Sequence, residues 1–429
     1  MQQIIFDRPY QFVPPHRGTW IPTLLEKMRA DELYLKWFEG VESFELRGVE
    51  HLRSSLRAGH GILLAPNHCR YADPIAMAAV SRAVGVFLYT MASWHLFNKS
   101  WLQSWAIRLC GGFSIYREGV DKKSLDTAIE ILAEGIRPLV IFPEGTVYRT
   151  NDRLHPLLDG IAFLARMASR RRLKESRPPV VVHPIAIKYL YRGDVQQDLE
   201  QEVLELEQRL SWEDQFAGGD MLSRVIRIDE ALLTLREIQW LGSPQDGTVA
   251  ARKHRLIAHL LDGLEQHHLG RTFSQDSVVS RIKQLRTRIV PLWQRATGEP
   301  RRQLWNEIRA TYVAQIIDGF DRDYLADPTD TRILESIERF QEDLNDEARR
   351  HRPLHCIIQI DTPIEVSGEK PPRGQPDPIV AELAARIQAM LDQLSQEAKP
   401  WPVPYQVALQ EVHDTLALTI DSVKAGLPA

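Results

Sequence analysis

Short apolar runs alternate with segments of helical periodicity from about residue 41 to residue 191, and this alternation constrains the fold more than any other feature of the sequence. Such alternation is typical of a β-sheet covered by helices. One intervening segment, Lys122–Glu134, places Leu125, Ile129 and Leu132 on a single helical face. We therefore expect an α/β fold in which a mixed sheet is flanked by helices. The expected strands are Ile62–Ala65, Gly85–Met91, Phe113–Tyr116, Leu139–Phe142 and Val180–Lys188.

The character of the sequence changes after residue 194. Leu199, Val203 and Leu206 recur at four-three spacing with charges between them, the pattern of a helix with a narrow apolar stripe. Strand character returns only in "LHCIIQIDTPIEV" (354–366). We predict that residues 1–194 and 352–429 form the α/β domain and that residues 195–351 form an all-helical insertion, suited to self-association or partner binding. A separate helical domain followed by a third domain is the less economical alternative. We find no convincing internal repeat.

The composition argues against several classes of protein. A net charge of −4 over 429 residues does not favour a nucleic-acid partner, since nucleic-acid-binding domains are usually strongly basic. Cys69, Cys110 and Cys356 are scattered, so we expect neither a disulfide framework nor a cysteine-rich metal site. The first residues lack the basic start and apolar core of a secretory signal. No uncharged run reaches the roughly 20 apolar residues of a membrane span. We therefore expect a cytoplasmic protein without a transmembrane helix, peripheral at the inner face of the membrane if it contacts the membrane.

The stretch "ILLAPNHCRYADPIAMAA" (62–79) places His68 and Asp73 where a strand ends. On a continuous helix, five steps turn two side chains roughly 500° apart, so these two can converge only across a turn. Asp73 followed by Pro74 reads as an N-cap with proline in the first helical position, which predicts a helix from Pro74 to about Ala83. His68 then lies on a strand-to-helix loop, where α/β folds usually carry chemistry. In the structural alternative, Asp73 only caps the helix and His68 only ends the strand.

Four blocks follow one another in order: "NHCRYAD" (67–73), "GGFSIYR" (111–117), "FPEGTVYR" (142–149) and "VVHPIAIK" (181–188). Each follows or contains an expected strand, so all four can meet along one edge of a sheet, where α/β folds bind ligands. Together they resemble the glycerol-phosphate and lysophosphatidate acyltransferase family, whose hallmark is a His-x4-Asp block followed by an arginine block, a Phe-Pro-Glu-Gly block and a proline-containing strand. The resemblance covers about residues 40 to 190.

The resemblance implies that His68 is a general base oriented by Asp73, with the substrate hydroxyl as the nucleophile. Imidazole, with an ordinary pKa near 6.5, is well matched to take a proton at neutral pH, and a carboxylate on its other nitrogen fixes the tautomer. The resemblance also implies no cofactor and no metal, since the acyl donor, acyl-CoA or an acyl-carrier protein, is a substrate.

The same resemblance implies a substrate-binding set in the other blocks. Arg117 matches the family's phosphate-binding arginine, and a guanidinium can hold a phosphate by two parallel hydrogen bonds. The structural alternatives are an exposed strand-end arginine and a simple turn at Pro-Glu-Gly. The expected substrate-binding residues are Arg117, Glu144, Gly145, Thr146, Arg149 and Pro184.

The chain departs from the family pattern at several positions. Val147 stands where the family usually has arginine, and Arg70 stands where it often has serine. Asp159-Gly160 replaces a common pairing of a basic residue with glycine. These departures leave the identity of the acyl acceptor open.

Two further patterns have both a structural and a functional interpretation. Trp94, Phe97, Trp101 and Trp105 recur at three-four-four spacing, which favours one helical face in the core over an acyl-chain groove or a bilayer contact. A basic cluster complements the end of a helix and could also attract anionic lipid or the phosphates of coenzyme A. The cluster consists of Arg166, Arg170, Arg171, Arg172, Lys174 and Arg177.

We therefore predict an O-acyltransferase that moves a fatty acyl group from acyl-CoA or acyl-carrier protein to a hydroxyl of a phosphorylated glycerol or lysophospholipid. One alternative is a membrane-associated scaffold with a degenerate acyltransferase domain. A second alternative is an acyltransferase for a non-glycerol lipid acceptor.

Overall fold

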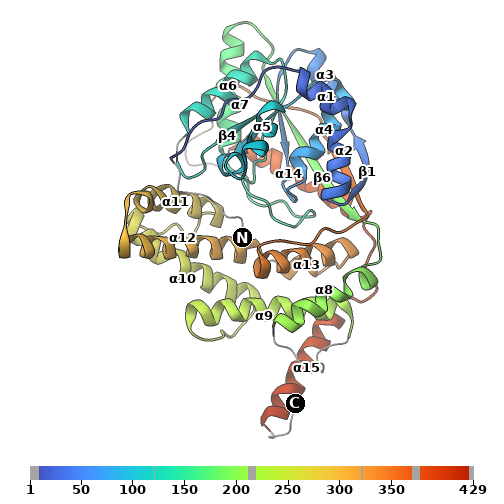
Figure 1. The fold of residues 1–429 in the computed structure, drawn as a ribbon, viewed down its shortest axis with the longest axis vertical. Helices are drawn as coiled ribbons and strands as arrows, with labels where there is room; N and C mark the ends of the chain where they lie inside the picture. The colour runs from blue at the N-terminus through green and yellow to red at the C-terminus, as the bar shows by residue number, and fades with distance from the viewer. Residues whose placement is uncertain (1–8, 120, 211–218, 320–321, 370–376, 425–429) are drawn as a thin grey trace. The chain divides into compact units, whose positions relative to one another are not determined.

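The computed structural model describes residues 9–119, 121–210, 219–319, 322–369 and 377–424. The chain divides into two compact units. One contains Gln3–Leu190 and Arg350–Glu397 and is called the α/β unit, and the other contains Tyr191–Arg349 and Ala398–Ala429 and is called the helical unit. Figure 1 shows the course of the chain through both.

The α/β unit is built on an eight-stranded sheet with the order β1-β7-β6-β2-β5-β3-β4, with β8 paired to β6. The pairs β1–β7, β6–β2, β2–β5, β5–β3 and β3–β4 are parallel, and β8 is antiparallel to β6. The expected mixed sheet is therefore confirmed. The strands are β1 (Val41–Arg47), β2 (Gly61–Pro66), β3 (Tyr89–Ser93), β4 (Gly112–Ile115), β5 (Leu139–Val140), β6 (Val180–Tyr191), β7 (Leu354–Ile360) and β8 (Ile364–Glu365).

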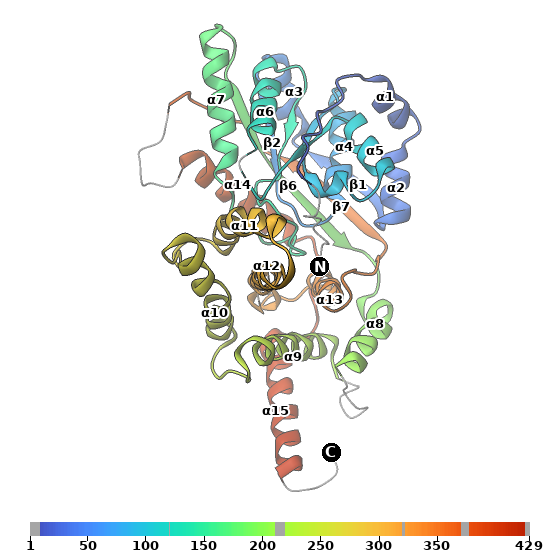
Figure 2. The ribbon, with the colours of Figure 1, turned by 60° about the vertical axis from the view of Figure 1, so that its left-hand side comes forward.

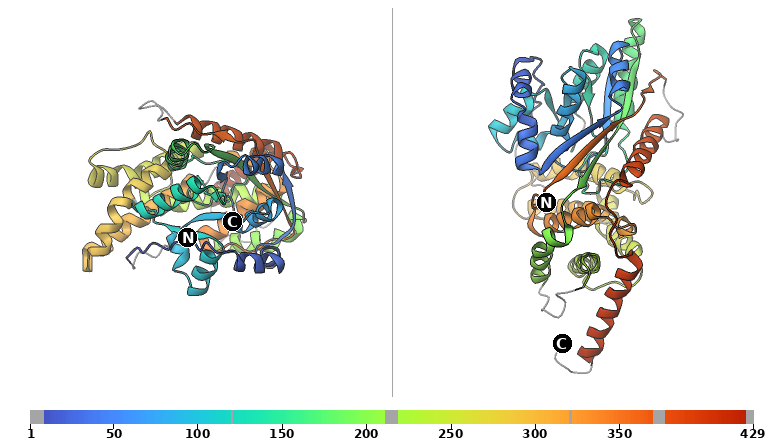
Figure 3. Two further views of the ribbon diagram at one scale, coloured as in Figure 1. Left: turned by 90° about the horizontal axis from the view of Figure 1, so that it is seen from above. Right: turned by 90° about the vertical axis from the view of Figure 1, so that its right-hand side faces the viewer.

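Helices cover both faces of this sheet. The unit contains α1 (Trp20–Lys27), α2 (Ala30–Phe38), α3 (Val49–Arg57), α4 (Asp73–Val84), the 3₁₀ helix η1 (Trp94–Phe97), α5 (Trp101–Leu109), α6 (Lys122–Glu134), α7 (Gly160–Lys174) and α14 (Pro378–Ser395). Figure 2 shows α6, α7 and α14 on one side of the sheet and α1, α2, α4 and α5 on the other. The right-hand view of Figure 3 shows the same separation, with the dark blue amino-terminal helices opposite the red α14. Strands β2 and β6 are buried along their whole length because both faces are covered.

Local sequence explains most of the boundaries. Helix α6 has the predicted bounds, and the Asp121 carboxylate at its N-cap accepts from the amide of Ser124. The strand expected at Gly85–Met91 begins only at Tyr89. Gly85 instead ends α4 with a φ of 70°, a left-handed conformation that favours glycine.

The helical unit contains α8 (Val195–Arg209), α9 (Met221–Leu241), α10 (Val249–Leu269), α11 (Val278–Arg295), α12 (Gly298–Gly319), the 3₁₀ helix η3 (Arg322–Leu325), α13 (Asp330–Asn345) and α15 (Tyr405–Lys424). Residues 398–429 therefore group with the helices, whereas we expected 352–429 to lie entirely in the α/β domain. Part of the reason is a set of contacts between this tail and α9: the indole nitrogen of Trp401 lies 3.1 Å from the carboxylate of Asp220, and Ser223 donates to Glu411.

The helical unit contains a repeat that sequence inspection missed. In α9, α10 and α11 the fourth residue is an arginine that binds a glutamate near the end of the preceding helix through two nitrogens. The arginine–glutamate pairs are Arg224–Glu207, Arg252–Glu237 and Arg281–Glu265, with nitrogen–oxygen distances of 2.7–3.0 Å. Bidentate pairing compensates for burying these charges. The sequence signal is the recurrence of "MLSR", "VAAR" and "VVSR" at the helix starts.

Candidate active site

The four sequence blocks lie in the α/β unit at or near the carboxyl ends of four strands. His68 follows β2, Glu144 follows β5, Arg117 follows β4, and the fourth block lies within β6, which pairs directly with β2. Because the carboxyl ends of parallel strands share one edge of a sheet, His68, Glu144 and Arg117 follow strands along the same edge, with β5 and β3 between β2 and β4.

His68 and Asp73 converge across the turn between β2 and α4. The His68 Nδ1 atom lies 2.9 Å from the Asp73 Oδ2 atom. The Asp73 side chain is fully buried, whereas that of His68 is 12% exposed. Since Nδ1 faces the carboxylate, Nε2 is the ring nitrogen that can take a proton from a substrate.

Asp73 is the first residue of α4 and not its N-cap. The capping position is occupied by Ala72, and no side chain caps the helix. The Asp73 carboxylate turns instead toward the preceding turn, where Oδ2 also accepts from the amide of Arg70 at 2.9 Å. The aspartate therefore fixes the turn that carries His68, in place of the predicted capping role.

Glu144 is buried and contacts the backbone on both sides of the site. One carboxylate oxygen accepts from the amide of His68 at 2.6 Å, and the other accepts from the amide of His155 at 3.0 Å. Burial raises the pKa of Glu144 to about 8, with a further increase from Asp73, while the two backbone hydrogen bonds lower it. We expected a substrate-binding carboxylate here, but the structure shows a carboxylate that holds the His68 loop.

The segment that carries Glu144 also contacts the imidazole ring and the carbonyl of His68. The ring of Phe142 stacks on the imidazole with 4.2 Å between centroids. The amide of Tyr148 donates to the carbonyl of His68 at 3.2 Å. The "FPEGTVY" segment thus contacts the ring, the amide and the carbonyl of His68, which limits the orientations of the imidazole.

The remaining residues of this block lie around the turn. Gly145 has a φ of 74°, which explains the glycine, and its amide donates to the carbonyl of Phe142 at 3.2 Å. Thr146 is partly exposed. The guanidinium of Arg149 lies 5.4 Å from the ring of Tyr71, so this arginine is beside the His68–Asp73 turn.

Arg117 is partly exposed in the segment after β4. It lies near enough to His95 that, together with Lys99, it adds to the lowering of the pKa of His95 to about 3, which is caused mainly by burial. His95 is therefore neutral, and the positive charge in this part of the site comes from Arg117 and Lys99.

Pro184 does not reach the edge of the sheet. It is buried within β6 opposite Ala65 of β2, and its carbonyl accepts from the amide of Asp361 at 3.0 Å. Its expected place in the substrate-binding set is not supported by this position, because residues in the middle of a covered strand are shielded from ligands.

The aromatic stripe is divided between two helices. Trp94 and Phe97 are buried in η1, but Trp101 and Trp105 are 80% and 49% exposed in α5. The predicted single core-facing helix is therefore wrong. Ser100 begins a new helix, and its hydroxyl accepts from the amide of Gln103.

The basic cluster is largely used inside the α/β unit. Arg172 donates to the carbonyls of Gly59, Ala133 and Pro178. Arg166 pairs with Asp377, and Arg177 donates to the carbonyl of Glu134. These contacts favour a structural role for Arg166, Arg172 and Arg177.

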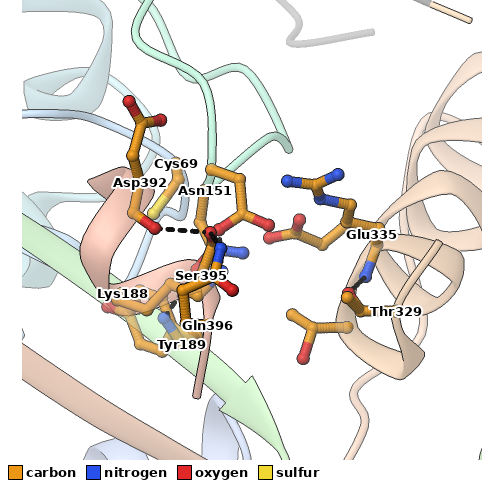
Figure 4. Close-up of polar contacts among 12 residues, drawn as sticks. Cys69, Asn151, Lys188, Tyr189, Thr329, Glu335, Asp392, Ser395 and Gln396 are labelled. Atoms are coloured by element: carbon orange, nitrogen blue, oxygen red, sulfur yellow. Dashed lines mark hydrogen bonds and ion pairs between the residues drawn. The ribbon is translucent and has the colours of Figure 1, made fainter. Parts of the chain in front are cut away.

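Sequence reasoning missed two residues that shape the site. The Asn67 side chain binds both the amide and the carbonyl of Ile187, which ties the end of β2 to β6. The Tyr189 hydroxyl donates to the Asp73 Oδ1 atom at 2.8 Å, and the Tyr189 amide donates to the Asn151 side chain at 2.7 Å. Figure 4 shows Tyr189, Lys188 and Asn151 gathered beside Cys69. Tyr189 directly follows the fourth block, which was the available signal.

Two further observations concern the described part of the chain. Within it, no group of three or more His, Cys, Asp or Glu side chains is arranged to hold a metal ion. None of its helices combines the length and hydropathy that a membrane span requires.

The fold and the site define an α/β unit, built on a mixed and mainly parallel sheet, with a histidine–carboxylate pair after β2. Residues 43–188 match the family model described as Acyltransferase. The chain is also 33% identical over 129 residues to the 1-acyl-sn-glycerol-3-phosphate acyltransferase of Streptococcus pneumoniae (strain ATCC BAA-255 / R6). That match covers 30% of this chain and 44% of the relative, so the similarity spans less than half of the relative's length. Residues 43–188 are therefore similar to the acyltransferase family.

Proposed function

We propose that the protein is an O-acyltransferase that moves a fatty acyl group from a thioester donor to the hydroxyl of a phosphorylated glycerol or lysophospholipid. The observation that carries the proposal is the His68–Asp73 pair, with 2.9 Å between Nδ1 and Oδ2, at the end of β2. The name of the pneumococcal relative supports a glycerol-phosphate acceptor.

His68 and Asp73 perform the proton transfers in this proposal. As the acceptor oxygen attacks the thioester carbonyl, its proton passes to His68 Nε2, and the buried Asp73 carboxylate stabilises the imidazolium. The tetrahedral intermediate then collapses, the carbon–sulfur bond breaks, and the imidazolium proton goes to the departing thiolate. The products are an ester and a thiol, and no covalent enzyme intermediate forms.

A thiol-release assay tests this function. Purified protein is mixed with acyl-CoA or acyl-carrier protein and a panel of acceptors that includes glycerol 3-phosphate, lysophosphatidate and a non-phosphorylated lysolipid. We expect acceptor-dependent release of thiol. If none of the acceptors causes thiol release, the scaffold alternative is favoured. If thiol is released only with acceptors that lack glycerol phosphate, the non-glycerol alternative that Val147 and Arg70 leave open is favoured.

The Arg117→Ala variant is expected to raise the KM for a phosphorylated acceptor by about 10- to 100-fold, since hydrogen bonds to charged groups contribute about 1.5–3 kcal/mol each. The KM for a matched acceptor without phosphate should change little. Steady-state kinetics with both acceptors measure this difference. Arg53→Ala, which removes an exposed arginine from α3, is the control. Equal losses with both acceptors would show that Arg117 does not recognise phosphate.

Peripheral membrane binding is part of the proposal and is supported by exposed apolar side chains on α1, α2 and α5, which together are called the aromatic face. Large side chains are exposed there, with aromatic rings that favour a bilayer interface. The carbonyl of Arg108, near the end of α5, accepts a hydrogen bond from the amide of His16. This bond connects α5 to the segment that precedes α1. The aromatic face consists of Trp20, Leu24, Met28, Leu33, Tyr34, Trp37, Phe38, Trp101, Leu102 and Trp105.

Replacing both Trp101 and Trp105 by alanine should weaken vesicle binding at least about tenfold, because each indole would lose roughly 1.5–3 kcal/mol of apolar burial. Co-sedimentation with phosphatidylethanolamine–phosphatidylglycerol vesicles measures the effect. Ile136→Ala is the matched control, since Ile136 is 71% exposed just after α6, outside the aromatic face. Equal binding by wild type and the double variant would remove α5 from the membrane-binding surface.

A further inference from the structure

The Asp73 carboxylate is held at both of its oxygens. Oδ2 lies 2.9 Å from His68 Nδ1 and accepts from the amide of Arg70, as described above. Oδ1 accepts from the Tyr189 hydroxyl at 2.8 Å, and the Cys69 thiol is a weaker donor at 3.8 Å. Without Tyr189, the only other described donor to Oδ1 is this thiol.

We infer that Tyr189 is a positioning residue for the proposed acyl transfer, acting through Asp73 to keep the His68 imidazole in its reactive orientation. The inference rests on the proposed function. It adds to the His68–Asp73 pair a third member from β6, a strand that the His-x4-Asp block does not include.

The phenol of Tyr189 is suited to this role because it is rigid. Tyr189 is fully buried, and its amide is fixed by the Asn151 side chain. The Arg70 guanidinium lies 5.4 Å from the centre of its ring. The backbone and the ring are therefore both held in place, so the hydroxyl has little freedom to leave Oδ1.

The phenol also stays protonated. Burial raises the pKa of Tyr189 well above its ordinary value, and the negative charge of Asp73 raises it further. Tyr189 is therefore a hydrogen-bond donor over the whole working pH range. A donor on Oδ1 fixes the carboxylate plane, so that Oδ2 points at His68.

The Tyr189→Phe variant tests the inference, with Tyr191→Phe as the matched control. Tyr191 lies two residues further along the same strand, and its hydroxyl donates to the Asp198 carboxylate at 2.6 Å. Each variant loses one phenol–carboxylate hydrogen bond and creates no large cavity. A general structural effect should therefore appear in both variants.

We expect Tyr189→Phe to lower kcat roughly tenfold while the KM for the acceptor stays within about twofold, since the hydrogen bond orients the base and does not touch substrate. Tyr191→Phe should keep the wild-type kcat. In an Asp73→Asn background, Tyr189→Phe should have little further effect, because its contribution passes through the carboxylate. Kinetics are measured at a temperature at which thermal melts show every variant folded.

A second measurement does not depend on activity. In wild type, proton NMR should detect the His68 Nδ1 proton at low field because of its bond to Asp73, and Tyr189→Phe should move this resonance upfield while Tyr191→Phe should not. Unchanged kcat and an unchanged resonance in Tyr189→Phe would overturn the inference. If wild type transfers no acyl group, the proposed function fails, and the resonance alone decides whether Tyr189 orients His68.

Discussion

Replacing His68 by alanine is expected to lower the rate of acyl transfer by about 10²–10⁴-fold, because the acceptor hydroxyl would lose its general base. The loss should appear in kcat, with modest changes in the KM values for donor and acceptor. The His68 side chain is partly exposed at the end of a strand, so its removal should cost little packing. Thiol release under saturating substrates measures the effect.

His355→Ala is the matched control for this experiment. His355 lies in β7 of the same unit, and its Nδ1 atom is 2.7 Å from the hydroxyl of Ser43. The His355→Ala substitution removes an imidazole from the sheet without changing a residue of the candidate site. A folded His68→Ala protein that turns over at the wild-type rate would rule out the proposed mechanism.

The placement of the four blocks on strands of one sheet could be predicted from the sequence because it follows from topology. Short apolar strands alternating with helices indicate a sheet in which most strands are parallel, and the carboxyl ends of parallel strands share an edge. The spacing of His68 and Asp73 also required a turn between them, which the structure contains. Strand order and the pairing of β6 with β2 could not be deduced from a single sequence.

Side-chain contacts inside the site could not be predicted in the same way. Spacing indicates that Glu144 and Gly145 follow a strand, but it does not indicate whether the carboxylate points to solvent or to the amide of His68. The contact between Tyr189 and Asp73 joins β6 to the start of α4, which are far apart in the sequence, so no local pattern encodes it. The split of the aromatic residues between η1 and α5 did have a local signal, since Ser100 is the N-cap of α5 and serine is a preferred N-cap residue.

The repeat in the helical unit was missed for a different reason. Apolar periodicity identifies a helix, but it does not indicate which charged residues are buried. Glu237 and Glu265 are fully buried, and each also accepts from a loop amide, those of Gln245 and Phe273. Comparison of the helix starts, rather than of the apolar stripes, is what detects the recurrence.

Glu144→Ala is expected to destabilise the α/β unit by about 2–6 kcal/mol, because two buried amides would lose their acceptor at about 1–3 kcal/mol each. The rate of acyl transfer should fall as well, mainly through kcat, because one of the two amides that lose their acceptor is that of His68. Urea unfolding and thiol release measure the two effects. Glu134→Gln, which changes a carboxylate paired with Arg17 at the end of α6, is the control. A large rise in the KM for the acceptor with unchanged stability would instead support the original prediction that Glu144 binds substrate.

The pH dependence of stability gives an independent test of the burial of Glu144. Burial raises its pKa to about 8 in the folded protein, whereas an unfolded glutamate has a pKa near 4.3. Between these values the folded state binds more protons than the unfolded state, so the contribution of this group to stability is present at low pH and is lost as the pH rises through about 8. Glu144→Gln cannot titrate. The unfolding free energy of wild type minus that of Glu144→Gln should therefore decrease between about pH 5 and about pH 9. A difference that stays constant over this range would mean that Glu144 is already ionised in the folded protein at pH 5, with its charge stabilised by the amides of His68 and His155.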